Sequence, residues 1–128
     1  MKVNIKTIID GLESVSDDVT VYYDTVTGDT VLWFEYGDNE DIDLEDLDTD
    51  RCIMFPDRYE INEYHMMESF AYDNSPELIR AIQGRGAFQR FRNKARELGL
   101  SESWYEFRDT CYRSKAEDWC RNKGLEWV

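Results

Sequence analysis

Histidine is almost absent from this chain: His65 is the only one among 128 residues, and no serine or cysteine nucleophile stands in a recognisable pattern with it. The sequence also lacks a CxxC pair, a GxSxG turn and a glycine-rich loop ending in GKS or GKT. Such patterns supply a metal ligand set, an activated nucleophile or a phosphate cradle. We therefore expect a non-enzymatic protein with no catalytic residue, no cofactor and no metal site.

Long apolar runs are missing as well. No stretch approaches the roughly 20 apolar residues that cross a bilayer, and the opening MKVNIKTIIDGLES has no apolar signal-peptide core. The three cysteines form an odd set, and Cys111 and Cys120 fall on opposite faces of one expected helix, about 13 Å apart along its axis. These features predict a reduced, cytoplasmic protein without a membrane segment.

Positive charge is scarce, with 15 Lys and Arg against 28 Asp and Glu and a formal net charge of -13. Residues 1–75 hold 20 acids and 4 bases, whereas residues 76–128 hold 8 acids and 11 bases. The pattern predicts an acidic and a mildly basic part. A chain of this length, with 14% aromatic residues, suffices for one core, so we expect a single domain over residues 1–128.

Periodicity predicts an α+β fold. We expect an N-terminal helix over residues 3–14, a β-hairpin over 19–35 that turns at Gly28, and a short third strand at RCIMF that Pro56 ends. A run of about four helices follows, near 60–72, 76–83, 86–98 and 103–122, with Ser75 capping the second and Ser103 the last. The expected core comprises Ile8, Val21, Trp33, Tyr64, Phe70, Leu78, Ile82, Phe88, Phe91, Trp104, Phe107 and Trp119.

Residues 35–50, EYGDNEDIDLEDLDTD, carry nine acids and no base. A calcium loop of the EF-hand type starting at Asp41 would need glycine and glutamate where Asp46 and Cys52 stand, so that interpretation fails. A solvated acidic loop and an acidic recognition surface both remain open. If the stretch is a recognition surface, its partner-binding residues are Asp38, Glu40, Asp41, Asp43, Glu45 and Asp46.

The stretch IQGRGAFQRFRNKAREL, residues 82–98, is the basic exception. Its Phe88 and Phe91 are spaced for a core and not as stacking platforms, so direct nucleic-acid binding is not expected. A solvated helix face, a salt-sensitive protein contact and an anion site are the alternatives. The anion site would use Arg58, Arg85, Arg90 and Arg92.

Three segments of the chain, PDRYEINEYHMMESF, AIQGRGAFQRFRNKARELGL and WYEFRDTCYRSKAEDWCRNKGL, together resemble an uncharacterised bacterial protein family, UPF0158. The resemblance covers residues 52–125 well and the hairpin VYYDTVTGDTV more loosely, while the acidic stretch 35–50 lies outside it. The family has no assigned activity, so the resemblance implies the limits of the domain and no function.

Two classes of function fit these features. The leading hypothesis is a small acidic interaction or regulatory domain of a bacterium or phage that binds a protein partner. In its sharper form, the domain imitates nucleic acid and inhibits a protein with a basic groove. The alternative is a phosphate-ligand or nucleic-acid binding domain, with or without enzymatic activity, that uses the basic helix from Arg85 to Arg96.

Overall fold

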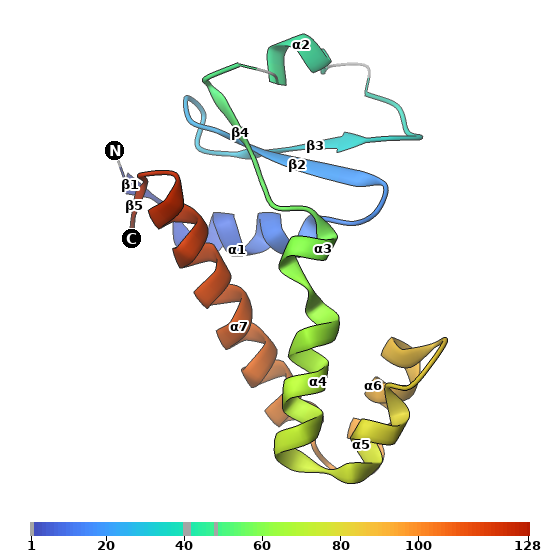
Figure 1. The fold of residues 1–128 in the computed structure, drawn as a ribbon. Coiled ribbons are helices and arrows are strands. Elements are labelled where there is room, and N and C mark those ends of the chain that lie inside the picture. Colours follow the sequence, from blue (N-terminus) through green and yellow to red (C-terminus); the bar gives the residue numbers. More distant parts are fainter. Residues whose placement is uncertain (1, 40–41, 48) are drawn as a thin grey trace. The chain divides into compact units, whose positions relative to one another are not determined.

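The computed structural model describes residues 2–39, 42–47 and 49–128 and shows the predicted α+β class (Figure 1). By its internal contacts the chain divides into two compact units. Unit 1 comprises Met1–Ile61 and Tyr112–Val128, and unit 2 comprises Asn62–Cys111. That the two units form one domain stays a prediction.

A three-stranded antiparallel sheet forms the centre of unit 1. Its strands are β2 (Val19–Asp24), β3 (Thr30–Phe34) and β4 (Cys52–Met54), in the order β3-β2-β4. The β2–β3 hairpin is confirmed, with Val21 opposite Leu32 and with Gly28 in the left-handed region at φ +76°. The third strand is confirmed too, and it ends before Pro56.

Helix α1 (Ile5–Ser14) packs its apolar stripe against this sheet. Asn4 caps it by accepting a hydrogen bond from the Lys6 amide, and Ile8 and Leu12 are buried. Beneath the sheet, the Phe55 and Tyr23 rings lie edge-on to Trp119, with centroids 4.5 and 6.5 Å away. Trp119 comes from the second half of α7 (Ser101–Asn122). Ile8, Val21 and Trp119 are therefore core residues as predicted, whereas Trp33 is only half-buried.

The two ends of the chain lie side by side in unit 1 (Figure 1). Strand β1 (Lys2–Val3) pairs in parallel with β5 (Glu126–Trp127), and the Val128 amide donates to the Val3 carbonyl at 2.9 Å. The Arg121 guanidinium stacks over the Trp127 ring at 5.3 Å. This pairing joins residues more than a hundred positions apart and was not predicted from the sequence.

The predicted helix over 60–72 is wrong in one respect, because Asn62 divides it. Helix α3 (Arg58–Ile61) ends there, and α4 (Glu63–Asn74) begins after Asn62, whose φ of +53° is left-handed. The Asn62 side chain accepts from the His65 amide at 3.2 Å. Tyr64, in the first turn after this break, is 37% exposed instead of buried, and its hydroxyl donates to the Ile82 carbonyl.

Unit 2 is built from α4, α5 (Pro76–Ala81), α6 (Ala87–Glu97) and the start of α7. Ser75 caps α5 and Pro76 is its first residue, as predicted. Helix α7 begins at Ser101, so the predicted cap at Ser103 is wrong; both residues lie inside the helix's first turn. Gly84 and Gly86 both adopt a positive φ in the connection between α5 and α6.

Four aromatic rings pack together in unit 2, those of Phe70, Phe91, Trp104 and Phe107. Phe70, Phe91 and Trp104 are buried and meet edge-on, with the Phe91 and Trp104 centroids 4.8 Å apart. Leu78 and Ile82 are buried as predicted. Phe88 and Phe107 are half-buried, so their prediction as fully buried is wrong. Phe91 occupies the centre of the α6 buried face, between Ala87 and Ala95.

Candidate functional site

Residues 35–50 form the acidic segment, which connects β3 to β4 and contains the short helix α2 (Leu44–Leu47). Six of its nine acids are among the described residues, and all six side chains are exposed: Glu35, Asp38, Asp43, Glu45, Asp46 and Asp50. The predicted site residues Glu40 and Asp41 lie outside the described residues. The four other predicted residues, Asp38, Asp43, Glu45 and Asp46, therefore belong to one exposed connection.

Two contacts hold the described parts of the acidic segment in place. The Asn39 amide group bonds the backbone of Phe34 at both its N–H and its C=O, at 3.1 and 2.8 Å. At the start of α2, the Asp43 carboxylate accepts from the Glu45 amide, and the Leu47 side chain is 4% exposed. The apolar side chain is thus the buried element, and the carboxylates face solvent.

The six described carboxylates of the acidic segment form no ion pair among the described residues, although Arg51 is attracted to one of them, Asp46. The four arginines of unit 1 each pair with an acid elsewhere: Arg51 with Asp24, Arg58 with Asp17, Arg113 with Glu117 and Arg121 with Asp118. Unpaired exposed charges of one sign repel each other and attract cations.

Beside α2 lies a pocket of about 520 Å³ whose lining includes Asp43, Asp46, Arg51 and Asp24. Asp24 is the one buried charged residue among those described, at 6% exposure. Arg51 donates to it twice, from Nε at 2.8 Å and from Nη2 at 2.7 Å, and the Val26 and Thr27 amides donate to its Oδ1. The Arg51 hydrogen bonds, outweighing burial, hold the pKa of the Asp24 carboxyl well below its usual range.

The Asp24–Arg51 pair was not predicted from the sequence. Asp24 lies at the strand's end, where the turn after it supplies two amide donors and the segment before β4 supplies the guanidinium. The sequence offers one signal for the Asp24 site: Asp24 stands just before the turn that contains Thr27 and Gly28, where an acid can accept hydrogen bonds from turn amides. Both residues of the pair line the pocket, and their charged groups are bonded to each other.

Two exposed aromatic side chains adjoin the acids. Phe34 is 42% exposed and Tyr36 is 87% exposed. Large exposed aromatic residues are enriched in the energetically dominant centre of protein–protein interfaces.

The net charge separates the two units. Unit 1 holds 20 acids and 8 bases, a balance of -12, and unit 2 holds 8 acids and 7 bases, a balance of -1. Unit 2 is nearly neutral because four bases of the C-terminal part, Arg113, Lys115, Arg121 and Lys123, belong to unit 1. The charge is therefore concentrated on the unit that contains the acidic segment.

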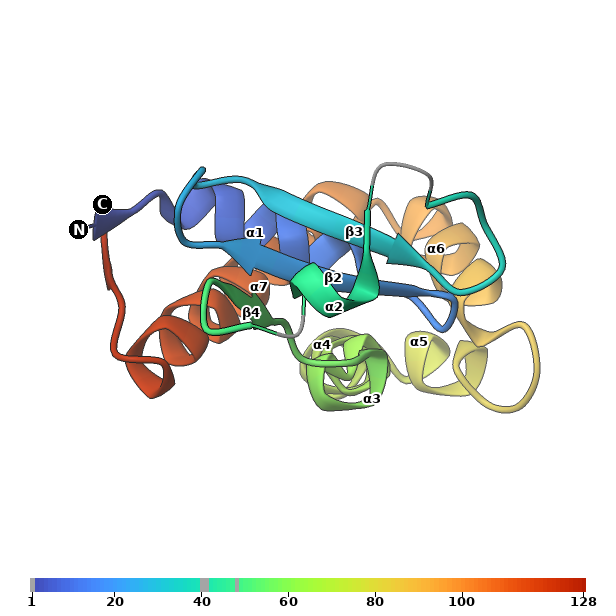
Figure 2. The same cartoon turned by 90° about the horizontal axis from the view of Figure 1, so that it is seen from above.

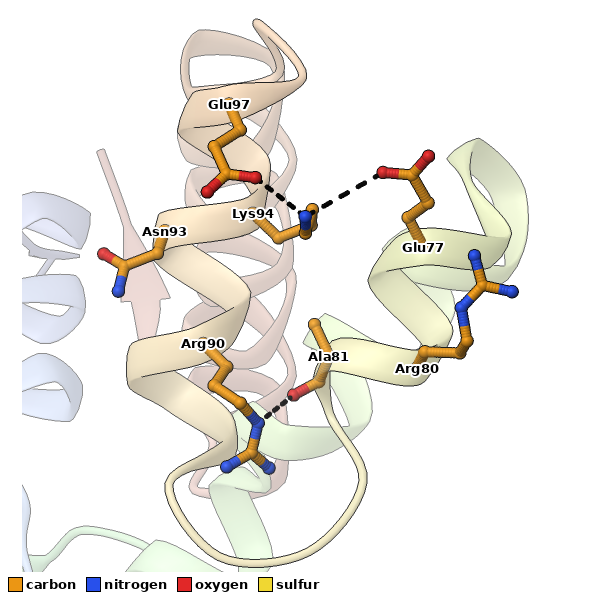
Figure 3. A pocket seen from close by; sticks show the side chains of 7 residues that line it. All are labelled: Glu77, Arg80, Ala81, Arg90, Asn93, Lys94 and Glu97. Atoms are coloured by element: carbon orange, nitrogen blue, oxygen red, sulfur yellow. Dashed lines mark hydrogen bonds and ion pairs between the residues drawn. The ribbon is translucent and has the colours of Figure 1, made fainter.

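The four arginines of the alternative anion site, Arg58, Arg85, Arg90 and Arg92, are divided between the two units, and the site as a whole stays a prediction. Arg58 belongs to unit 1 and pairs with Asp17 at 2.5 Å. Arg90, in unit 2, uses its guanidinium for backbone carbonyls: Nε donates to Ala81 at 3.0 Å (Figure 3), and the two Nη groups donate to Gln83 and Arg85. These carbonyls lie at the C-terminal end of α5 and in the loop after it, where a cation is stabilising.

A pocket of about 430 Å³ lies between α5 and α6 and is lined by Arg80, Arg90, Asn93, Lys94, Glu77, Glu97 and Ala81 (Figure 3). Lys94 stands between two carboxylates, 2.7 Å from Glu97 and 4.0 Å from Glu77. The hydrogen bond that Lys94 donates to Glu97 raises the pKa of Lys94. Arg85 and Arg92 are exposed and do not line this pocket. A bound anion would find the pocket's Arg90 and Lys94 already engaged.

Groups suited to catalysis or metal binding are sparse in the described ranges 2–39, 42–47 and 49–128. No cluster of three or more His, Cys, Asp or Glu side chains has metal-binding geometry there. His65 is exposed, with 69% of its side chain accessible and Nδ1 3.5 Å from Oε1 of Glu68. Within the same ranges, no helix has the length and apolar character that a bilayer crossing requires.

The fold and site define a small α+β protein with one strongly acidic unit. The chain matches the uncharacterised protein family UPF0158 over residues 1–128, so it belongs to that family. The match is wider than the expected 52–125 and includes the acidic segment. No curated protein and no solved structure matches the chain.

Proposed function

We propose that this protein is a non-enzymatic interaction module that binds a basic protein partner through the acidic segment of unit 1. The observation that carries the proposal is the set of six exposed carboxylates without a cationic partner in the described part of the chain. The unit contains arginines, yet each is used in a pair outside the segment. A basic partner would form ion pairs with these carboxylates and relieve their mutual repulsion.

Exposed aromatics favour binding over solubility alone. Phe34 is the last residue of β3 and Tyr36 belongs to the acidic segment, and both offer apolar area beside the charges. Rim charges accelerate association, while aromatic side chains supply most of the affinity at an interface centre. Together they provide the two parts that an interface with a basic partner needs.

In the sharper form of this proposal, the acidic segment binds in a groove of the partner that otherwise binds nucleic acid. At physiological ionic strength the Debye length is about 8 Å, so the carboxylates act on a partner only at contact range. A groove lined by Lys and Arg for phosphates offers such close contact. The free thiols of Cys52 and Cys120 support action in a reducing compartment, which we propose is the cytoplasm.

The competing anion-binding function draws less support from the geometry. Arg90 holds the loop after α5, and Lys94 is shared by two glutamates. Arg90 and Lys94 would have to break these bonds within the protein before they could bind a phosphate.

The test is affinity capture of the tagged full chain from its native host, after nuclease treatment, at low and high salt. One variant replaces Asp38, Asp43, Glu45 and Asp46 by Asn or Gln. The matched control replaces four exposed acids of unit 2, Asp73, Glu102, Glu106 and Asp109, in the same way. Both variants lose the same charge, so only the position of that charge differs.

The proposal predicts that a partner is captured by the wild type and by the control variant at low salt, and is lost from the acidic-segment variant. Salt should release it, because the contact is electrostatic. Equal capture by both variants would show that the acidic segment is not the binding surface. Retention that depends on intact nucleic acid would favour the anion-binding function.

A further inference from the structure

We propose that the open edge of β3 binds an extended segment of the basic partner as an additional antiparallel or parallel strand. This inference rests on the proposed function and specifies how the partner docks. Strand β3 borders the sheet, with β2 on its inner side and, among the described residues, no further strand on its outer side (Figure 2). An exposed sheet edge presents unpaired N–H and C=O groups, which an extended peptide can bond.

The hydrogen-bond register shows which residues present these groups. The Glu35 amide donates to the Asp18 carbonyl and the Asp24 amide to the Asp29 carbonyl, both at 2.9 Å. Bonded and non-bonded pairs alternate along an antiparallel ladder. With Val21 opposite Leu32 and Tyr23 opposite Thr30, those two pairs are non-bonded, so Leu32 and Thr30 direct their backbone groups outward.

One end of the edge is already closed. Phe34, the third residue whose backbone points outward, has its N–H and C=O bonded by the Asn39 side chain, which takes the place of a neighbouring strand. Across the described residues, the backbone N–H and C=O of Thr30 and Leu32 have no hydrogen-bond partner on that side. The open part of the edge is therefore Thr30–Leu32.

The opposite edge is less suited to docking. The Thr25 and Phe55 amides bond across the β2–β4 pair, to the Arg51 and Val21 carbonyls, so the outward groups of β4 are those of Cys52 and Met54. The Cys52 amide is already bonded to the Thr49 carbonyl at 3.3 Å. This leaves a single residue, Met54, whereas β3 presents two.

Side chains and charges specify the occupant. The strand TVLWF is uncharged, and its Val31, Leu32 and Trp33 are half-buried, so a partner strand with apolar residues would pack against them. Exposed Asp29 precedes the strand, and exposed Glu35 follows it. The same acids disfavour pairing between two copies of this chain, each of net charge -13. The occupant is thus an extended, apolar segment of another protein, flanked by Lys or Arg.

The first test uses a probe peptide, Lys-Lys-Val-Thr-Val-Thr-Val-Lys-Lys, and the wild-type full chain. Its control is the same peptide with alternate backbone amides N-methylated, which keeps the charge and removes the donors for the edge. Amide hydrogen exchange followed by NMR reports the edge directly. We expect the Thr30 and Leu32 amides to exchange rapidly in the free protein and slowly with the unmethylated peptide.

The second test uses Leu32→Pro, which removes an outward N–H while leaving the ladder to β2 intact. Its matched control is Leu32→Ala, which removes the same side chain and retains the N–H. Relative to Leu32→Ala, Leu32→Pro should weaken peptide binding about tenfold, the loss expected for one or two hydrogen bonds. Near-UV circular dichroism checks that both variants keep their fold, and the methylated peptide gives the same comparison without any protein variant.

Three results overturn the edge proposal: equal affinity for the two peptides, no binding up to about 1 mM, or protection at other amides only. A dimer in sedimentation that Leu32→Pro abolishes would also overturn it, since the edge would then pair with a second copy. If Leu32→Pro retains the captured partner that the acidic-segment variant loses, the edge proposal fails and the proposed function stands. If both variants retain the captured partner, the edge proposal and the proposed function both fail.

Discussion

Replacing Asp24 by Asn tests the Asp24–Arg51 pair beneath the acidic segment. The change removes the charge of a carboxylate that is 6% exposed and leaves its volume almost unchanged. It weakens two hydrogen bonds from the Arg51 guanidinium, at 2.7 and 2.8 Å, and those from the Val26 and Thr27 amides. No cavity forms, so the cost comes from electrostatics and hydrogen bonding alone.

The magnitude depends on Arg51, whose side chain is 51% exposed. A hydrogen bond to a charged group contributes about 1.5–3 kcal/mol. After the substitution, water solvates the freed guanidinium, so the penalty for an orphaned buried charge does not apply. We therefore expect the free energy of unfolding to fall by about 2–3 kcal/mol at pH 7, and the melting temperature by roughly 6–15 °C.

The pH dependence distinguishes this mechanism from a packing defect. The folded-state pKa of Asp24 is lowered, so the carboxylate's contribution is complete above its unfolded-state pKa, about 3.9, and is lost as the pH falls through the lower folded-state pKa. Urea denaturation of the wild type and the variant should show a constant difference between pH 7 and pH 5, and a smaller one at pH 3 and below. A difference below about 1 kcal/mol at pH 7, or one unchanged at pH 2.5, would refute the reasoning.

Three further predictions concern unit 2. Phe91→Ala should cost about 3–5 kcal/mol in unfolding free energy, because Phe91 is 0% exposed among aromatic rings, and half-buried Phe88→Ala should cost clearly less; equal losses in urea melts would contradict the assigned core. Arg90→Met should destabilise by about 1–2 kcal/mol, since Arg90 bonds three carbonyls, while Arg92→Met should stay within about 0.5 kcal/mol; thermal melts compare the two. Fluorescence anisotropy with DNA and RNA at physiological salt should show no micromolar binding, and binding that Arg92→Glu abolishes would reverse this expectation.

Local sequence signals predicted most of the fold. The alternation of β-branched and aromatic residues around Gly28 located the hairpin, and Ser75-Pro76 located the start of α5, because both depend on neighbouring residues. The same signals failed at Asn62, which reads as an ordinary helix residue but adopts a left-handed φ of +53°. Tyr64 was placed in the core for that reason.

Features made by distant residues were not predictable from the chain alone. The parallel pair β1–β5 has two residues on each side, too few for a sequence pattern. Charge composition predicted the acidic segment, but not that unit 1 uses its arginines elsewhere. Arg90 is exposed, as the periodicity of its helix predicts, but the periodicity does not indicate that its guanidinium bonds three carbonyls nine, seven and five positions away.

The discontinuity of unit 1 has a consequence for the order of folding during translation. Unit 2 is one uninterrupted stretch, Asn62–Cys111, whereas unit 1 requires Tyr112–Val128 to join residues that left the ribosome much earlier. Trp119 completes the aromatic cluster with Tyr23 and Phe55, and β1 has no partner strand until β5 emerges. The nascent hairpin therefore displays its inner aromatic face while unit 2 is synthesised, and emergence of Tyr112–Val128 from the exit tunnel is the event that closes unit 1.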